Sequence, residues 1–207
     1  MIVTQLERIT AYRVHTPKWA SMPLSGAGAA THGGRVNRPG IEALYLALDV
    51  QTAIDEYKQV STLLPPGTFV TYQISCALIV DFREGFNARE WDPLWEDFYC
   101  DWRALWFNNR IELPSWVLGD MVLSAGAKGV LFNSRVASTG TNLVLYPSMF
   151  NEADTVSVFD PPVRFRKTKG RGNKRSGFWI ASVWHFQNAA GHHLSIKLRG
   201  LCEQTIR

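Results

Sequence analysis

The chain alternates between short apolar runs and polar turn sequences, a pattern typical of β-strands. Runs at 9–16, 43–49 and 69–82 are rich in β-branched or large apolar residues and predict three strands. Two later runs, "GVLFNS" and "NLVLYP", predict a further pair joined by the turn sequence "RVASTGT". We therefore expect a sheet, with strands clustered late in the chain.

Helical patterns lie between these strands. Asp49 can cap a helix over "VQTAIDEYKQV", and Asp92 with Pro93 can begin another over "WDPLWEDFYCDWRALWFN". A third helix is predicted over "PSWVLGDMVLSAGAKG", with Gly126 near its C-terminus. The stretch 23–40 is rich in Gly, Ala, Ser and Pro, and this composition predicts a long loop. Loops of this length are often functional.

The second of these helices would carry an aromatic stripe. Its aromatic residues recur at steps of three and four, which places them on one helical face: Trp91, Trp95, Phe98, Trp102 and Trp106. Such a stripe is usually part of the core. The alternative is a groove that binds a partner.

The order of elements predicts an α+β fold, a single domain on a bent mixed or antiparallel sheet with flanking helices. Composition changes after Pro161-Pro162. Residues 1–160 hold 12 Lys and Arg against 17 Asp and Glu, a formal charge of −5, whereas residues 161–207 hold 10 against 1, a charge of +9. We therefore divide the chain into a main domain, 1–160, and a basic C-terminal extension, 161–207, of unknown role.

Composition excludes several classes of protein. With 46% hydrophobic and 19% charged residues, the chain is typical of a folded globular protein. No apolar run reaches the roughly 18 residues of a membrane span, and the N-terminus lacks the pattern of a signal peptide. The three cysteines are too scattered for a disulfide framework or a zinc site, and they favour a reducing cytoplasm.

Three sequence stretches carry the candidate chemistry. They are "YRVHTPKWASMPLSGAGAATHGGRVN", "ALYLALDVQTAIDEY" and "GVLFNSRVASTGTNLVLYP". In this order and spacing they resemble the RES domain, a family named for Arg, Glu and Ser positions. Those positions match Arg35, Glu56 and Ser134, and Tyr45 matches an aromatic position of the family. The sequence departs from the pattern at Val36, where the family usually has an aromatic residue, and in the basic tail.

The resemblance implies a fold like that of bacterial ADP-ribosyltransferase toxins and a cleft for NAD⁺ as substrate, with no metal or prosthetic group. It also implies that an Xre-like antitoxin is the partner, that nucleic acid is contacted only through that antitoxin, and that no membrane is involved. The activity it implies is cleavage of the nicotinamide–ribose bond, with water, phosphate or a protein side chain as acceptor. A glycohydrolase or phosphorylase is our first expectation, and a protein mono-ADP-ribosyltransferase is the alternative.

These roles fit the chemistry of the residues. A carboxylate, Glu56, would stabilise the positive charge that develops on the ribose. Arg35 offers a planar fork of donors to the pyrophosphate, Tyr45 a ring for stacking, and Ser134 a hydrogen bond to the substrate. We count these four as candidate catalytic residues.

Further candidates lie around these four. Arg13 is a candidate second anchor for NAD⁺ and Asn142 a rim residue, while His15 and His32 are more often structural or exposed. Arg135 would face away from Ser134 if the strand continued.

Two other classes of function stay open. The basic tail could bind nucleic acid non-specifically, although "RFRKTKGRGNKR" has no interleaved aromatic residues. The second class is a domain without catalytic activity that only binds its partner. Val36 is the residue that suggests this class. The sequence does not identify the acceptor, any protein target, the antitoxin or the oligomeric state.

Overall fold

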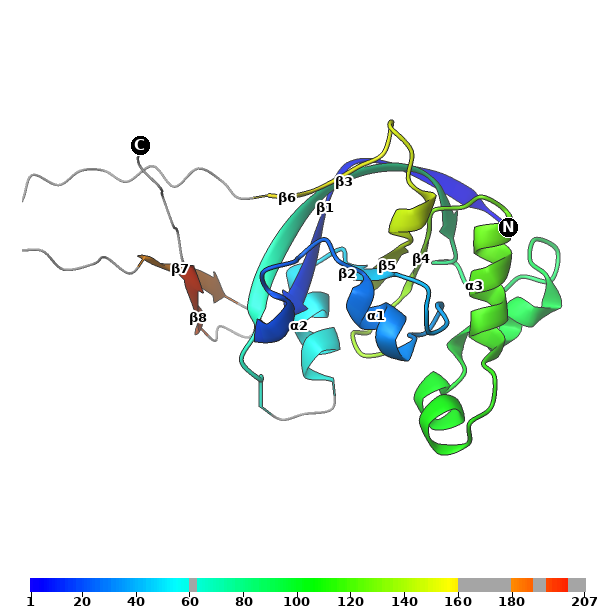
Figure 1. Ribbon diagram of the computed structural model, residues 1–207, viewed down its shortest axis with the longest axis horizontal. Coiled ribbons are helices and arrows are strands. Elements are labelled where there is room, and N and C mark those ends of the chain that lie inside the picture. The colour runs from blue at the N-terminus through cyan, green and yellow to red at the C-terminus, as the bar shows by residue number, and fades with distance from the viewer. Residues whose placement is uncertain (60–62, 160–179, 188–192, 201–207) are drawn as a thin grey trace, which may run out of the picture. The chain divides into compact units, whose positions relative to one another are not determined.

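The computed structural model describes residues 1–59 and 63–159 in full, together with the backbone of 180–187 and 193–200. Contacts divide the chain into two compact units, Met1–Asp160 and Pro161–Arg207 (Figure 1). In the second unit, β7 (Ile180–Gln187) and β8 (His193–Gly200) pair as an antiparallel hairpin. The sequence "RFRKTKGRGNKR" lies outside the described residues.

The first unit is built on a six-stranded sheet in the order β1-β2-β5-β4-β3-β6. Its strands are β1 (Val3–His15), β2 (Leu44–Ala47), β3 (Thr68–Asp81), β4 (Gly129–Asn133), β5 (Thr141–Leu145) and β6 (Thr155–Val158). Because β1 also pairs with β3, the strand pairings form a closed ring, and β1 and β3 curve strongly over the molecule (Figure 1). Pairing is parallel between β3 and β4 and antiparallel between the other partners. The expected mixed α+β domain is confirmed.

Three α-helices flank this sheet: α1 (Ala27–His32), α2 (Val50–Lys58) and α3 (Pro114–Ser124). Short turns of 3₁₀ helix occur at Pro17–Trp19, Pro93–Tyr99 and Pro147–Met149, and a π-helix spans Ala104–Asn108. In Figure 1, α1 and α2 lie below the sheet on one side, and the green segment that precedes α3 lies on the other.

The alternation of apolar residues explains how the sheet is buried on both faces. In β5, Leu143 and Leu145 belong to a core cluster with β1 and β3, whereas Val144 and the following Tyr146 face a second cluster with α3. All four side chains are fully buried. Fourteen buried residues form the second cluster, which includes Trp91, Trp95 and Phe98.

Most expected elements are confirmed. The side chain of Asp49 accepts a hydrogen bond from Thr52 N at 2.8 Å and caps α2, and Asp92 accepts one from Leu94 N at 2.9 Å. β1 begins earlier than expected, because residues from Val3 onward pair with the end of β3 across two register shifts. The expected loop 23–40 contains α1.

The continuous aromatic helix was a wrong prediction. The 3₁₀ helix Pro93–Tyr99 ends at Cys100, which is extended, and a separate π-helix follows. Only the first three residues of the stripe are buried in the core; Trp102 and Trp106 are half-buried. The stripe therefore divides into a core part and a part that lies at the surface.

Candidate functional site

A cavity of about 600 Å³ lies on the face of the sheet that carries α1 and α2. Its floor includes a row of cross-strand partners on β1, β2, β5 and β4: Tyr12, Ala47, Asn142 and Phe132. Its walls come from the loop after α1, from α2, from residues 100–103 and from the turn after β4. Ligand pockets span roughly 300–1,000 Å³, so the cavity has room for a small-molecule substrate.

The double glycine before Arg35 allows the loop to lie directly on the sheet. Gly33 has φ +76°, a conformation that side chains other than glycine rarely adopt. A Cβ on Gly34 would lie 2.3 Å from the hydroxyl of Tyr45. Any side chain at either position would push the loop, and Arg35 with it, away from the cavity.

The backbone of this loop is fixed from the other side by three side chains. The carbonyls of Gly34, Arg35 and Val36 accept hydrogen bonds from Trp116 Nε1 (2.7 Å), Ser115 Oγ (2.6 Å) and the Tyr146 hydroxyl (2.6 Å). Three consecutive carbonyls are thus held by α3 and the end of β5. The position of Arg35 is therefore set before any ligand binds.

The Arg35 guanidinium joins two walls of the cavity. Its Nη1 donates to the carbonyls of Phe98 (3.2 Å) and Cys100 (3.1 Å). Within the described residues its Nε and Nη2 have no hydrogen-bond partner, and these donors remain for a ligand. Burial lowers the pKa of Arg35, and nearby Cys100 and Tyr45 oppose this shift. The group stays protonated, since arginine does not lose its charge in proteins.

Glu56 is held from two strands. Its Oε1 accepts hydrogen bonds from Ser134 Oγ at 2.7 Å and from Asn142 Nδ2 at 2.6 Å. Its Oε2 accepts a longer one, 3.3 Å, from Gln59 Nε2. Ser134 and Asn142, which are 78 and 86 positions away from Glu56 in the sequence, therefore fix one of its oxygens. Glu56 lines the cavity.

The structure gives Ser134 a different part from the expected contact with substrate. The Ser134 side chain is buried, and its hydroxyl oxygen also accepts from the backbone N–H groups of Val136 and Ala137, both at 3.0 Å. With these bonds made, its hydroxyl orients Glu56. Among the described residues, Ser134 therefore contacts Glu56 and is not part of the cavity lining.

Tyr45 lines the cavity with its ring, while its hydroxyl serves the loop. The hydroxyl donates to Asn37 Oδ1 at 2.7 Å and accepts from Val36 N at 3.1 Å. Burial raises the pKa of Tyr45 well above its ordinary value. The phenol therefore stays protonated at neutral pH, and because its hydroxyl is bonded to the loop, the ring face is what it can offer to a ligand.

Arg13 is a second cavity arginine, on β1. Its Nη1 is buried and has no hydrogen-bond partner among the described residues. Burial lowers its pKa, and the nearby Tyr72 and Tyr45 oppose this shift. A buried guanidinium with an unused donor is costly without a ligand, which supports Arg13 as an anion anchor.

The other candidates are placed as follows. His15 is buried, with Nε2 2.6 Å from the Tyr72 hydroxyl, and burial beside Arg13 lowers its pKa to about 4. His32 is exposed. Val36 is buried in the core cluster next to α3 and, within the described part of the chain, is not among the residues that line the cavity. The position at which the sequence departs from the family pattern is therefore a core position here.

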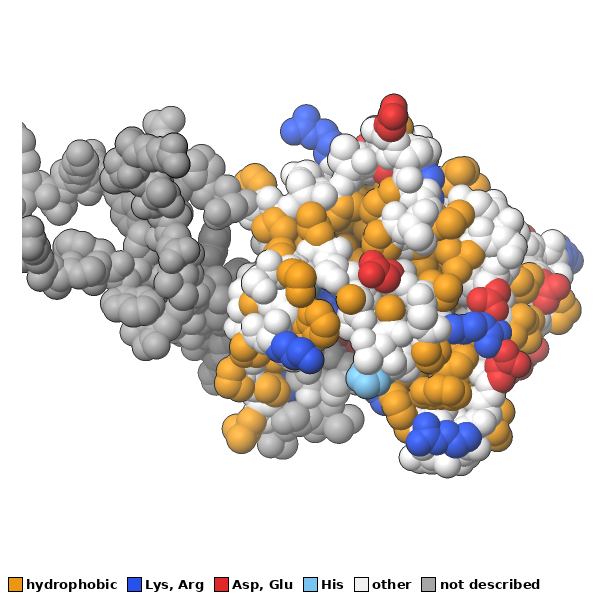
Figure 2. All heavy atoms as spheres, viewed as in Figure 1, with side chains coloured by type: hydrophobic (Ala, Val, Ile, Leu, Met, Phe, Trp, Pro, Cys, Tyr) orange, Lys and Arg blue, Asp and Glu red, His pale blue; other side chains and the backbone are white. Residues whose placement is uncertain are grey.

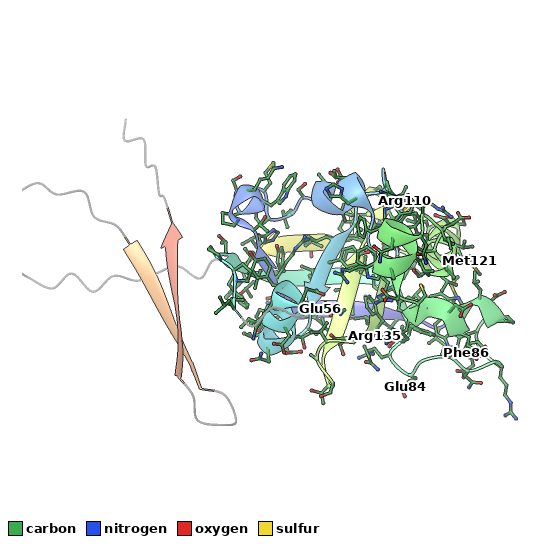
Figure 3. All side chains as sticks on the ribbon, turned by 90° about the horizontal axis from the view of Figure 1, so that it is seen from below. Glu56, Glu84, Phe86, Arg110, Met121 and Arg135 are labelled. Carbon is green, nitrogen blue, oxygen red and sulfur yellow. The ribbon has the colours of Figure 1, made fainter. Side chains whose placement is uncertain are left out.

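Sequence reasoning missed two arginines. Arg135 lines the cavity because β4 ends at Asn133 and the chain turns at Ser134, so strand alternation no longer applies. Figure 3, a view from below, shows Glu56 and Arg135 in the same central region next to α2. Arg103 lines the wall formed by residues 100–103. With Arg13 and Arg35, four arginines face two carboxylates, Glu56 and Asp101, so the cavity favours an anionic ligand.

One cluster of paired charges lies outside the cavity. Figure 2 shows acidic and basic side chains next to one another beside α3, where Arg38 forms ion pairs with Glu112 and with Asp120 (2.7 Å for the latter). Within residues 1–59 and 63–159, no group of three or more His, Cys, Asp or Glu side chains could hold a metal ion. No helix in the described residues is long and apolar enough to cross a membrane.

Fold and cavity together define an α+β protein with an arginine-rich pocket in which the Glu56 carboxylate is fixed by hydrogen bonds. A family model, the RES domain, matches residues 10–168, so the chain belongs to the RES family. The crystal structure of the M. tuberculosis MbcT–MbcA toxin–antitoxin complex contains a chain with a similar fold. The TM-score is 0.50 at 19% identity, over 76% of this chain and 85% of that one. No curated protein matches the sequence.

Proposed function

We propose that this protein is a toxin that consumes NAD⁺ by cleaving its nicotinamide–ribose bond. The observation that carries the proposal is the pairing of a fixed carboxylate, Glu56, with arginines that have unused donors in one cavity. NAD⁺ presents a pyrophosphate to the arginines and, at the ribose whose bond breaks, a developing positive charge to the carboxylate.

The reaction needs little from the protein beyond position and charge. The C–N bond between ribose and nicotinamide breaks, and nicotinamide leaves as a neutral molecule with the bonding electrons. The ribose passes through an oxocarbenium-like state, and a water oxygen then bonds to its anomeric carbon and releases one proton. Glu56 Oε2 would face the developing charge, while Oε1 stays bound to Ser134 and Asn142. Nicotinamide is already a good leaving group, so the proposal involves no metal or prosthetic group.

The proposal includes a partner and a compartment. Family membership and the toxin–antitoxin complex that contains a similar fold support neutralisation by an antitoxin, which we expect to be Xre-like. The substrate is an intracellular metabolite, so we place the toxin in the cytoplasm.

Product analysis tests the function. Purified protein is incubated with NAD⁺, with and without inorganic phosphate, and the products are separated. Free nicotinamide with ADP-ribose indicates a glycohydrolase, and a phosphorylated ADP-ribose that forms only with phosphate indicates a phosphorylase. Labelled protein would indicate a mono-ADP-ribosyltransferase. Unchanged NAD⁺ under all conditions would contradict the proposal.

A further inference from the structure

The segment between the 3₁₀ helix and α3 contains an aromatic side chain that the proposed chemistry leaves without a role. Trp102 is half-buried and lines the cavity, whereas the sequence placed it in the core stripe. The helix that would have kept Trp102 in the core ends at Cys100. The carbonyls of Phe98 and Cys100 at that end are bound by Arg35.

Arg35 therefore determines where Trp102 lies. By holding the Phe98 and Cys100 carbonyls, the arginine fixes the end of the 3₁₀ helix beside its own guanidinium. Trp102 follows Cys100 by two residues, and the backbone N–H of Trp102 donates to the Cys100 carbonyl at 2.9 Å. Trp102 thus lines the same cavity as Arg35, the arginine that we assign to the pyrophosphate.

The indole is braced by its own neighbours. The Arg103 guanidinium lies 4.4 Å from the ring centroid, and the Phe107 ring lies 6.0 Å away at 53°. Phe107 belongs to the π-helix Ala104–Asn108, a rare element that often occurs at functional sites. A rigid aromatic face on the wall of a pocket is suited to stacking with a planar ring.

NAD⁺ offers two planar rings, and charge distinguishes between them. Nicotinamide is cationic in the substrate and would be repelled by Arg103, which already covers the indole. Adenine is neutral, and every nucleobase has a face for stacking. Glu56, the carboxylate suited to the cationic end, is on α2, and the carboxylate of this segment, Asp101, accepts a hydrogen bond from the backbone N–H of Ala104 at 3.2 Å.

We propose that Trp102 is the stacking platform for the adenine ring of the substrate, and that Arg103 holds the indole in place. This inference rests on the proposed function for the identity of the ligand. Trp102 contributes to binding and takes no part in bond cleavage. Replacement of Trp102 should therefore not change the KM of substrates that lack adenine.

Two replacements at position 102 distinguish aromatic stacking with the ligand from simple filling of space. Trp102→Phe keeps an aromatic face, and Trp102→Leu keeps only apolar bulk. Trp106→Leu is the matched control, because Trp106 is in the same segment but packs on Trp116 with ring centroids 4.7 Å apart. The probes are ADP-ribose for equilibrium binding, and NAD⁺ and nicotinamide mononucleotide for nicotinamide release.

We expect Trp102→Leu to raise the Kd for ADP-ribose and the KM for NAD⁺ about 10- to 100-fold, with little change in kcat. Trp102→Phe should recover most of this loss, and turnover of nicotinamide mononucleotide should be equal in all variants. Equal losses for Leu and Phe, or an equal loss with the mononucleotide, would overturn the inference. So would wild-type protein that does not bind ADP-ribose. Binding that depends on Trp102 without any nicotinamide release would refute the proposed function and leave this inference standing.

Discussion

Arg35→Ala removes the residue that connects the glycine loop, the aromatic segment and the proposed pyrophosphate site. In the structure its Nη1 makes two hydrogen bonds to carbonyls, at 3.2 and 3.1 Å, and the residue lines the cavity. Hydrogen bonds to charged groups contribute about 1.5–3 kcal/mol each. Because the side chain is half-buried, we expect the lower end of that range for each bond, and therefore a loss of about 3 kcal/mol in the free energy of unfolding.

Substrate binding should suffer more than stability. Loss of one charged contact to the pyrophosphate corresponds to a KM for NAD⁺ raised about 10- to 150-fold. Arg35→Lys keeps the charge but not the planar fork, so its KM should lie between those of wild type and alanine.

The matched control is Arg38→Ala, three residues further along the same loop. Arg38 forms its ion pairs with exposed side chains outside the cavity. It should lose at most about 1 kcal/mol of stability and keep its KM. The assays are nicotinamide release over a range of NAD⁺ concentrations and thermal unfolding. An unchanged KM for Arg35→Ala, or equal effects at the two arginines, would refute the assignment.

Three further predictions follow from the packing. Trp95→Ala should lower the free energy of unfolding by about 3–5 kcal/mol and Trp102→Ala by much less, because only Trp95 is fully buried; equal losses in chemical denaturation would contradict this. A chain that ends at Asp160 should fold and release nicotinamide like the full chain, since the described residues that line the cavity all belong to the first unit; an unfolded or inactive product would show that the extension completes the domain. Between pH 6.5 and about 4 the unfolded chain holds more protons on His15 than the folded chain, so the free energy of unfolding should fall as pH falls. This fall should be less steep in His15→Gln, and an equal dependence of the melting temperature on pH in both proteins would exclude this role of His15.

The sequence predicted local structure well where the signals were local. The caps at Asp49 and Asp92 and the strand patterns need only neighbouring residues, and they are confirmed. The aromatic stripe failed because a residue 65 positions away, Arg35, binds the carbonyl of Cys100 at the point where the expected helix stops. Periodicity contains no information about such a contact.

The candidate site was predicted as a set of residues and not as a geometry. Glu56, Ser134 and Asn142 meet through hydrogen bonds, but nothing in the sequence shows that the Ser134 hydroxyl donates to Glu56. Arg135 was misjudged because strand alternation was extended past Asn133, where the backbone N–H groups turn to bind Ser134 Oγ. Family resemblance identified the residues, and only tertiary structure could assign their contacts.

The central claim is that the Glu56 carboxylate stabilises the breaking of the nicotinamide–ribose bond. Glu56→Gln keeps an oxygen that can accept from Ser134 and Asn142 but removes the charge. Asp55→Asn is the control, because Asp55 points about 100° away on α2 and accepts a hydrogen bond from Gln51 outside the cavity.

The decisive measurement is the rate of nicotinamide release from saturating NAD⁺ by wild type and both variants, with folding checked by circular dichroism. We expect kcat to fall about 10²–10³-fold for Glu56→Gln and little for Asp55→Asn. A folded Glu56→Gln protein with near wild-type turnover, or a larger loss at Asp55, would contradict this expectation.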